Sequence, residues 1–211
     1  MALASVFFVS LAVSVMAFLS AFASLSTVQR VLLVAVVAGA VTGAVLTFSA
    51  ASTPPTLRGG YGEYQPASDP IAAPLVAFLD PDGNTIKLDA FMNRIVVLNF
   101  WATWCAPCIK ELPSLDRLQA SLDPDQARVV LVTIDRKGTE VAQPFLKDLG
   151  IKNLTTYADL QAELAQSLGA IGLPMTVILD REGRVRGQLQ GDADWDSDAA
   201  KALVRHYVEE G

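Results

Sequence analysis

The chain has 211 residues with a formal net charge of −6, and 52% of its residues are hydrophobic. Arg30 is the one charged residue before residue 58, which leaves 15 basic and 22 acidic side chains in the rest of the chain. Such an acidic region without a basic stripe argues against nucleic acid as a partner. Two cysteines and one histidine are too few for the four ligands of a structural zinc site, so we predict no metal and no cofactor.

Residues 1–50 predict membrane segments, because they hold two apolar stretches, 2–29 and 31–48, each near the ~20 residues needed to cross a bilayer. We expect either a hairpin of two spans with Arg30 in the turn, or one span over 31–48 behind an N-terminal extension. Under the positive-inside tendency Arg30 lies in the cytoplasm in both cases, and everything after residue 50 lies outside. A third interpretation takes residues 21–23 as a signal-peptidase site and 31–48 as a stop-transfer segment, which would leave the domain in the cytoplasm.

Residues 51–70 are rich in Pro, Gly and Ser, and this composition predicts a linker. The remaining residues, 71–211, are enough for one compact domain. We expect this domain to begin with a β-hairpin, because residues 75–79 and 85–88 flank the turn signature Asp-Pro-Asp-Gly at 80–83.

A continuous apolar run at residues 95–101 predicts a central strand that is covered on both faces. The two cysteines, Cys105 and Cys108, follow shortly after this strand. We expect a helix from about residue 105 to residue 121, with Pro107 in its first turn. The strand, the turn and the helix start therefore meet at a pair of thiols.

A thiolate at a helix N-terminus meets unpaired N–H groups and the positive end of the helix dipole, which lower its pKa from about 8.5 toward neutrality. Because two residues separate Cys105 from Cys108, the sulfurs can close a disulfide or open one in a partner. A structural bridge across so short a loop contributes little stability. The pair therefore predicts a thiol–disulfide oxidoreductase.

The rest of the domain alternates between strands and helices. Further strands are predicted at residues 128–134, 154–157, 175–179 and 185–189, and further helices at 139–149, 159–168 and 196–208. The last two strands flank an Asp-Arg-Glu-Gly turn and form a second hairpin, and Asp159 is the expected N-cap of its helix. The parallel part is a β-α-β unit that places the cysteines at the carboxyl end of a strand, where open α/β sheets hold their sites.

From residue 75 to its end the chain resembles the thioredoxin superfamily, and more narrowly the membrane-anchored, TlpA-like and ResA-like thiol:disulfide interchange proteins. Residues 97–113 carry most of the resemblance, residues 172–180 resemble the cis-proline strand of the family, and residues 191–195 resemble the TlpA branch. The resemblance implies a thioredoxin-like three-layer α/β fold. This fold has a central mixed sheet with helices on both faces and an N-terminal β-hairpin, here preceded by one or more transmembrane segments.

The resemblance also implies roles for three residues of the first block. Cys105 is the attacking thiolate, Cys108 is the buried resolving thiol, and the two form the redox-active disulfide. Thioredoxins proper carry a buried Asp where this chain has Asn99, whereas the TlpA and ResA kind place a Glu three residues after the second cysteine, as Glu111 does here. A partly buried Glu111 could accept or return the Cys108 proton; the alternative is a solvated helix charge.

Substrate docking is expected at three further residues. The resemblance implies that Pro174 is cis and packs against the disulfide, and that Leu173 offers its backbone to an extended substrate segment. Trp104 is expected to be an exposed aromatic residue that docks partners. Two residues nearby are assigned to structure alone: Trp195 to packing of the last helix, and Asn99 to a buried amide satisfied by backbone.

The direction of the reaction follows from the residues between the cysteines. Ala106 and Pro107 supply no charge to stabilise the thiolate, and a less stabilised thiolate means a more reducing couple. The resemblance then implies a reductase in the inner membrane with its catalytic domain in the periplasm. Its clients would be cysteine pairs of cytochrome oxidase copper-site proteins or apocytochrome c, and its electron donor a membrane thiol transporter of the CcdA or DsbD kind.

Three alternatives are weighed against this function. A cytochrome c maturation thioredoxin of the CcmG kind tends to have an acidic residue after the cis-proline, where this chain has Met175. A Sco-like copper chaperone needs a C-x-x-x-C motif and a ligating histidine, which are missing. A peroxiredoxin needs Thr at the position of Ala102, and Thr103 is one residue off.

Overall fold

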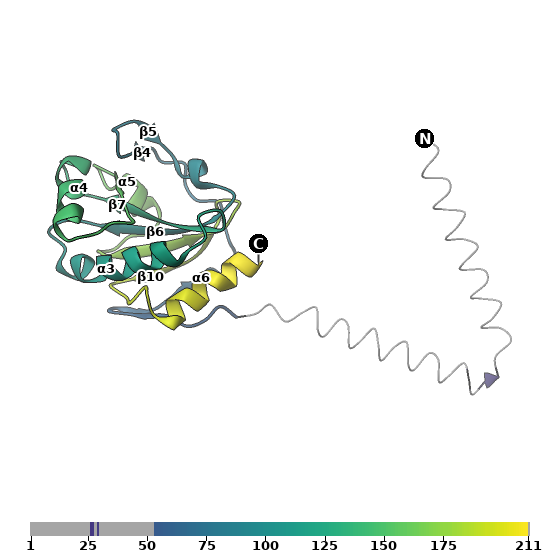
Figure 1. The fold of residues 1–211 in the computed structure, drawn as a ribbon. Coiled ribbons are helices and arrows are strands. Elements are labelled where there is room, and N and C mark those ends of the chain that lie inside the picture. Colours follow the sequence, from purple (N-terminus) through teal and green to yellow (C-terminus); the bar gives the residue numbers. More distant parts are fainter. Residues whose placement is uncertain (1–25, 28, 30–52, 211) are drawn as a thin grey trace, which may run out of the picture. The chain divides into compact units, whose positions relative to one another are not determined.

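The computed structural model describes residues 26–27, 29 and 53–210. Apart from residues 26, 27 and 29, the predicted membrane segments of residues 1–50 lie outside the described residues. No helix within the described ranges has both the length and the apolar character needed to span a bilayer. Residues 54–211 form one compact unit, which contains the cysteine pair (Figure 1).

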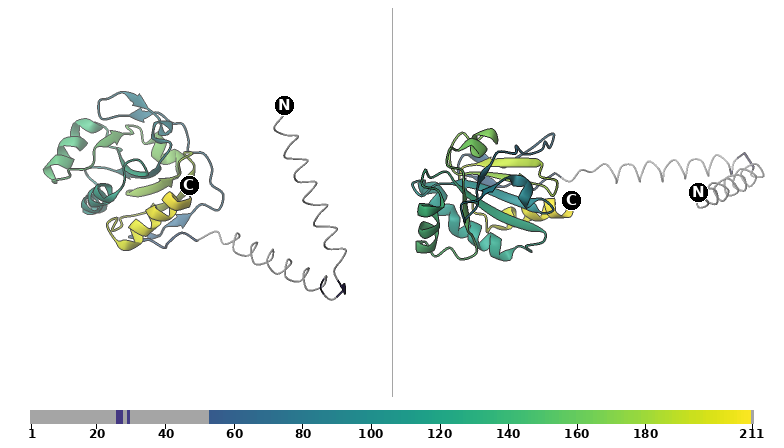
Figure 2. Two further views of the ribbon diagram at one scale, coloured as in Figure 1. Left: turned by 45° about the vertical axis from the view of Figure 1, so that its right-hand side comes forward. Right: turned by 90° about the horizontal axis from the view of Figure 1, so that it is seen from above.

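An eight-stranded mixed sheet runs through the centre of this unit in the order β3-β10-β9-β6-β7-β8-β4-β5 (Figures 1 and 2). Its inner strands β6 and β7 are parallel, as are β7 and β8, whereas β9 runs antiparallel to both β6 and β10. The strands are β3 (Gln65–Pro66), β4 (Phe78–Leu79), β5 (Thr85–Ile86), β6 (Ile95–Trp101), β7 (Ala127–Thr133), β8 (Thr156–Ala158), β9 (Met175–Leu179) and β10 (Val185–Gln190). A separate ribbon pairs β1 (Arg58–Gly59) with β2 (Gly62–Glu63).

Helices cover both faces of the sheet (Figure 2). One face packs against α3 (Ala106–Ser121), α4 (Thr139–Asp148) and α6 (Asp198–Glu210). The other packs against α5 (Glu163–Ser167), the 3₁₀ helix η1 (Leu88–Phe91) and the β4–β5 hairpin. The three-layer thioredoxin-like fold with its early hairpin is thus confirmed for the described residues.

The central strand β6 shows why this arrangement forms. All seven of its residues are buried, and their side chains alternate between the two layers. Val97 and Trp101 lie in the cluster with α3, whereas Leu98 and Phe100 lie in the cluster with α5. Each such side chain contributes about 1.5–3 kcal/mol when fully buried. A strand apolar on both faces is therefore stable only inside a covered sheet.

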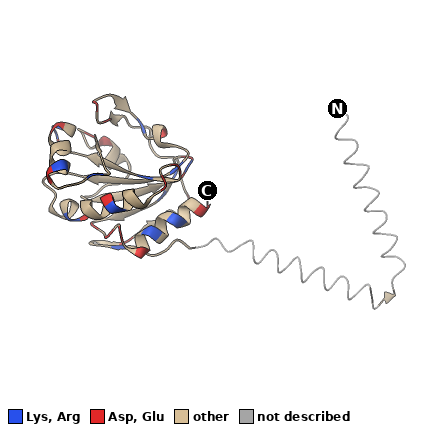
Figure 3. Ribbon diagram, in the orientation of Figure 1, with Lys and Arg blue, Asp and Glu red and all other residues tan. Residues whose placement is uncertain are grey.

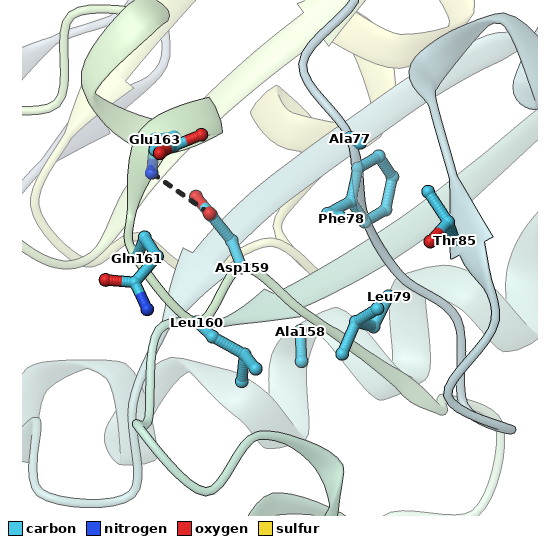
Figure 4. Close-up of a pocket in the computed structure, with 9 residues that line it drawn as sticks. All are labelled: Ala77, Phe78, Leu79, Thr85, Ala158, Asp159, Leu160, Gln161 and Glu163. Atoms are coloured by element: carbon cyan, nitrogen blue, oxygen red, sulfur yellow. Dashed lines mark hydrogen bonds between the residues drawn. The ribbon is translucent and has the colours of Figure 1, made fainter.

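Most predicted elements are found within two residues of their expected ends, but α5 is shorter than predicted. It begins at Glu163 rather than Asp159, because Ala162 just before it has a left-handed backbone with φ of 56°. Asp159 still holds the helix start, since its two carboxylate oxygens accept hydrogen bonds from the N–H groups of Glu163 (Figure 4) and Ala165, both at 3.0 Å. Burial raises the pKa of this carboxyl. Figure 4 shows the shallow pocket that Asp159 shares with the β4–β5 hairpin.

The prediction of a linker over residues 51–70 is wrong for residues 57–66. Leu57 and Tyr64 are buried in the core beneath α6, and β3 pairs with the edge strand β10. The Tyr64 hydroxyl donates a 3.1 Å hydrogen bond to the hydroxyl of Tyr207 in α6. Gly59 and Gly60 serve close packing, because a Cβ on either would collide with Asp192, and the N–H of Gly60 donates to the Asp192 carbonyl at 2.7 Å. Composition predicted a linker because Leu57 and Tyr64 are only two large apolar residues among many Gly, Pro and polar residues.

Candidate active site

Cys105 and Cys108 form a disulfide at the start of α3, with their Cα atoms 5.2 Å apart. Cys105 is the N-cap of the helix, and its Sγ accepts a hydrogen bond from the Cys108 N–H at 3.3 Å. Pro107 stands in the first turn, where no backbone donor is needed. Cys105 is 5% exposed and Cys108 is completely buried. An incoming nucleophile or disulfide can therefore approach the first sulfur more readily than the second.

Glu111 lies one helical turn after Cys108 and is only 2% exposed, so it is not a solvated helix charge. Its Oε1 accepts a hydrogen bond from Asn99 Nδ2 at 2.8 Å. Its Oε2 accepts from the Ala193 N–H at 3.0 Å and from Trp195 Nε1 at 3.1 Å. Burial raises the pKa of Glu111 to about 7, although the three hydrogen bonds oppose that rise. Both its protonation states are thus accessible near neutral pH.

Asn99 connects Glu111 to the sheet. Its Nδ2 also donates to Thr176 Oγ1 at 2.9 Å, because β9 pairs with β6 so that these two residues lie directly opposite each other. The expectation that backbone groups satisfy this amide is wrong: Nδ2 bonds two side chains, and Oδ1 has no partner among the described residues. The alternation along β6 could have indicated this, since Asn99 shares the face of Val97 and Trp101 that packs on α3.

The cis-proline segment lies at the same edge of the sheet as the disulfide. The Leu173–Pro174 peptide bond is cis, as the resemblance implies. Met175, the next residue, pairs with Phe100 near the end of β6, from which the chain leads to Cys105. The backbone N–H and C=O of Leu173 make no hydrogen bond within the described part of the chain. Trp104 is exposed as expected, with 68% of its surface accessible.

The Redoxin family matches residues 66–203, which is more than half of the chain. The chain belongs to the Redoxin family. Its relatives include the thiol-disulfide oxidoreductase ResA of Bacillus thuringiensis subsp. konkukian, 31% identical over 121 residues that cover 57% of this chain and 68% of the relative. ResA of Bacillus subtilis is 29% identical over 113 residues, or 54% of this chain and 62% of the relative.

Solved structures agree with this assignment. A Chlorobium tepidum protein with the name thiol:disulfide interchange protein DsbE is 28% identical and superimposes with a TM-score of 0.59, covering 67% of this chain and 98% of that one. StoA from Bacillus subtilis, 23% identical with a TM-score of 0.50 over 64% of this chain and 98% of its own, shares the fold. The resemblance to the TlpA and ResA kind is thereby confirmed.

Sequence reasoning missed two residues of this Redoxin domain that support the site. Trp195 was assigned to packing, and it is indeed completely buried in the core, but its indole N–H also donates to Glu111. Asp135 was not singled out at all. Its carboxylate accepts hydrogen bonds from the N–H and the hydroxyl of Thr103, both at 2.9 Å, and so ties the loop before Cys105 to the end of β7. The signal for Asp135 was its place directly after a predicted parallel strand.

Among the described residues, no group of three or more His, Cys, Asp or Glu side chains lies close enough to hold a metal ion. The site brings together two sulfurs and a buried carboxyl one helical turn after the second of them. In this structure the sulfurs are in the oxidised, disulfide form.

Proposed function

We propose that this protein is a membrane-anchored, extracytoplasmic reductase of cysteine pairs in client proteins. The chain is a thiol–disulfide oxidoreductase of the ResA and DsbE type, as its family, its relatives and its cysteine pair indicate. The observation that carries the proposal is the disulfide at the N-terminus of α3, with Cys105 the more accessible sulfur and Cys108 buried one turn before Glu111.

The exchange proceeds in two balanced steps once the pair is reduced. The Cys105 thiolate attacks one sulfur of the client disulfide, forms a mixed disulfide, and releases the first client thiolate. The Cys108 thiolate then attacks the Cys105 sulfur and releases the second client thiolate. Each released client thiolate takes up one proton, in balance with the protons that Cys105 and Cys108 lost when they became thiolates. The client gains two electrons and two protons, and the Cys105–Cys108 disulfide is restored. A dithiol on a partner protein must reduce it again.

Glu111 has the position and the proton affinity to take the Cys108 proton before the second step. It is on the same helix face as Cys108, three residues on, and is shielded from water. Its raised pKa, about 7, lies between those of an ordinary carboxyl and a thiol, so it can accept a proton and later return it. Asn99 cannot do this because an amide does not titrate.

The substrate segment is proposed to bind across Trp104, Leu173 and Pro174. The free backbone groups of Leu173 can pair with an extended peptide in the manner of an added strand. Such pairing would hold a client disulfide over Cys105, while the exposed Trp104 ring contacts the flanking side chains.

Three sequence features support the reducing direction, the periplasmic location of the domain and the choice of clients. The uncharged Ala106 and Pro107 favour a reducing couple. The predicted spans within residues 1–50 support a membrane anchor with the domain on the periplasmic side. The resemblance to TlpA-like and ResA-like proteins supports clients in cytochrome oxidase copper-site assembly or cytochrome c biogenesis, and a donor of the CcdA or DsbD kind.

Trapping tests this function directly. Cys108→Ala, expressed in the native host, should accumulate mixed disulfides between Cys105 and its clients, which mass spectrometry identifies; Cys105→Ser is the matched control that should trap none. Purified protein should also reduce insulin disulfides with a thiol donor. A measured potential near about −120 mV, as in strong oxidants, would contradict the reducing direction. Trapping of apocytochrome c partners alone would favour the narrower CcmG kind of function.

A further inference from the structure

A two-residue basic turn stands next to the redox loop. The N–H of Gly138 donates to the carbonyl of Asp135 at 2.8 Å, which closes a turn with Arg136 and Lys137 at its centre. Gly138 has a φ of +55°, a left-handed conformation that glycine adopts readily. The side chains of Arg136 and Lys137 are exposed, and neither makes an ion pair or a hydrogen bond with any described residue.

This turn is held in a fixed position relative to the attacking sulfur. Asp135, its first residue, is buried and binds both the N–H and the hydroxyl of Thr103 through its carboxylate. Thr133 at the end of β7 donates to the same carboxylate at 2.7 Å. Thr103 is two residues before Cys105. The turn that carries the two cations is therefore joined by a buried hydrogen-bond network to the loop that leads to Cys105. We call this turn, this loop and the cis-proline segment at the same edge of the sheet the redox face.

The charge of this turn contrasts with the rest of the domain, which has 22 acidic and 15 basic side chains from residue 58 onward. Figure 3 shows acidic and basic residues interspersed over its helices and loops. Many other cations are neutralised in ion pairs, among them Arg58, Lys110, Arg117, Arg184, Arg186 and Lys201. Three acidic residues belong to or flank the segments at this turn: Asp135, whose carboxylate accepts three hydrogen bonds, Asp159, whose carboxylate accepts from the N–H groups of Glu163 and Ala165, and the exposed Glu140 in the first turn of α4. None of the three forms an ion pair with Arg136 or Lys137 within the described part of the chain.

Apolar side chains complete this face. Trp104 is 68% exposed, and Ile171, three residues before the cis-proline, is 91% exposed. Exposed apolar side chains offer contact area to a bound partner when they stand beside a reactive group. The redox face thus offers an exposed aromatic ring directly before Cys105 and two positive charges on the adjoining turn.

We propose that the Arg136–Lys137 turn selects client polypeptides whose cysteine pair is flanked by acidic side chains, with Trp104 and Ile171 receiving apolar neighbours of the cysteines. This selection rests on the proposed reductase function. Charges at the rim of a contact act mainly on the rate of encounter and on its salt dependence. Unpaired cations on a turn joined to the loop before Cys105 attract carboxylates on the client and repel basic segments.

Matched peptides test the selection. Three oxidised peptides share one Cys-x-x-Cys core and differ in four flanking positions, which are all Glu, all Ser or all Lys. The reduced full chain should reduce the Glu peptide with a kcat/KM about tenfold above that for the Lys peptide at low salt, and this ratio should shrink at about 0.5 M salt. In Arg136→Glu/Lys137→Glu the order of the two peptides should reverse, and in Arg136→Ser/Lys137→Ser the preference should vanish.

Lys147→Glu/Lys152→Glu is the control, because it changes the net charge equally at two exposed residues at and beyond the far end of α4. It should keep the wild-type ratio. Equal ratios in both charge-reversed proteins, or an unchanged ratio in Arg136→Glu/Lys137→Glu, would overturn the proposal.

If wild type fails to reduce even the Ser peptide, the reductase function fails instead. In that case binding is measured instead, by Trp fluorescence, with the same peptides carrying Ser in place of Cys. The Glu-flanked peptide should still bind more tightly than the Lys-flanked one, and this difference should be lost in Arg136→Ser/Lys137→Ser.

Discussion

Asn99 Nδ2 donates a 2.8 Å hydrogen bond to Glu111 Oε1, and this contact joins the central strand β6 to the helix that carries both cysteines. Thioredoxins proper have a titratable Asp where Asn99 stands, so here the amide orients a carboxyl on the neighbouring helix instead of titrating itself. The carboxyl that can move a proton has thereby shifted from the strand to α3.

Replacing Glu111 should change the pH dependence of the second exchange step. With a pKa of about 7, ionised Glu111 accepts the Cys108 proton above neutrality, so the wild-type rate should rise through an inflection near pH 7. Glu111→Gln should lose this inflection and be slower above pH 7 by on the order of 10²-fold. Stopped-flow release of a client thiol from the preformed mixed disulfide measures this step. Glu140→Gln, the same change at an exposed residue of α4, should behave as wild type; superimposable profiles for Glu111→Gln and wild type would show that the proton passes directly to water.

The same carboxyl should make folding stability depend on pH. Because its pKa is raised from 4.5 to about 7, the folded state binds the proton more tightly than the unfolded chain does. Stability from this group is therefore fully present below about pH 4.5 and is lost as the pH rises through about 7. Between pH 4.5 and pH 8, wild type should lose on the order of 3 kcal/mol more than Glu111→Gln in urea unfolding of the oxidised protein. Contributions from other carboxyls, such as Asp159, cancel in this difference, and parallel curves for the two proteins would contradict the shift.

Trp195→Phe should raise the pKa of Glu111 further. The change keeps an aromatic ring in the core but removes the indole N–H that donates to Oε2 at 3.1 Å, and losing a donor to the ionised form favours protonation. The inflection of the exchange rate should move to higher pH by up to about one unit. Trp101→Phe is the control, because it loses an indole hydrogen bond of the same length to Thr156 and leaves Glu111 untouched. An equal shift in both variants would mean that general loosening of the core, and not the Trp195 donor, sets the proton affinity.

Leu57→Ala should destabilise the domain, although Leu57 lies in a segment with the composition of a linker. Leu57 is 3% exposed, and removing a buried leucine side chain costs about 2–5 kcal/mol. Leu75→Ala makes the same chemical change at a residue that is 62% exposed and should cost less than about 1 kcal/mol. Urea midpoints of the fragment 54–211 compare the two. Equal midpoints would show that residues 57–66 do not contribute to the fold in solution.

Local patterns predicted the parts of this protein that depend on neighbours along the chain. The apolar run of residues 95–101 is β6 with the same ends, the strand at residues 175–179 is β9 with the same ends, and Cys105 caps the helix expected to begin there. These features are readable because a strand's burial, a helix start and a hairpin turn are each set by a few consecutive residues. The cysteine spacing likewise indicated the redox chemistry without any structure.

The tertiary structure alone decided which polar groups surround that chemistry. Trp195 reaches Glu111 across 84 positions of the chain, Thr176 meets Asn99 across 77, and Asp135 meets Thr103 across 32. Each contact depends on strand register and on how a helix lies over the sheet, which no local pattern contains. Leu57 and Tyr64 were missed for the same reason, since polar residues flank both in a Pro- and Gly-rich segment, whereas in space both lie in the core. The sequence by itself therefore determined the reactive cysteine pair and the strand and helix that carry it. The tertiary structure decided the proton affinity of Glu111, because hydrogen bonds and desolvation depend on which residues the fold brings together.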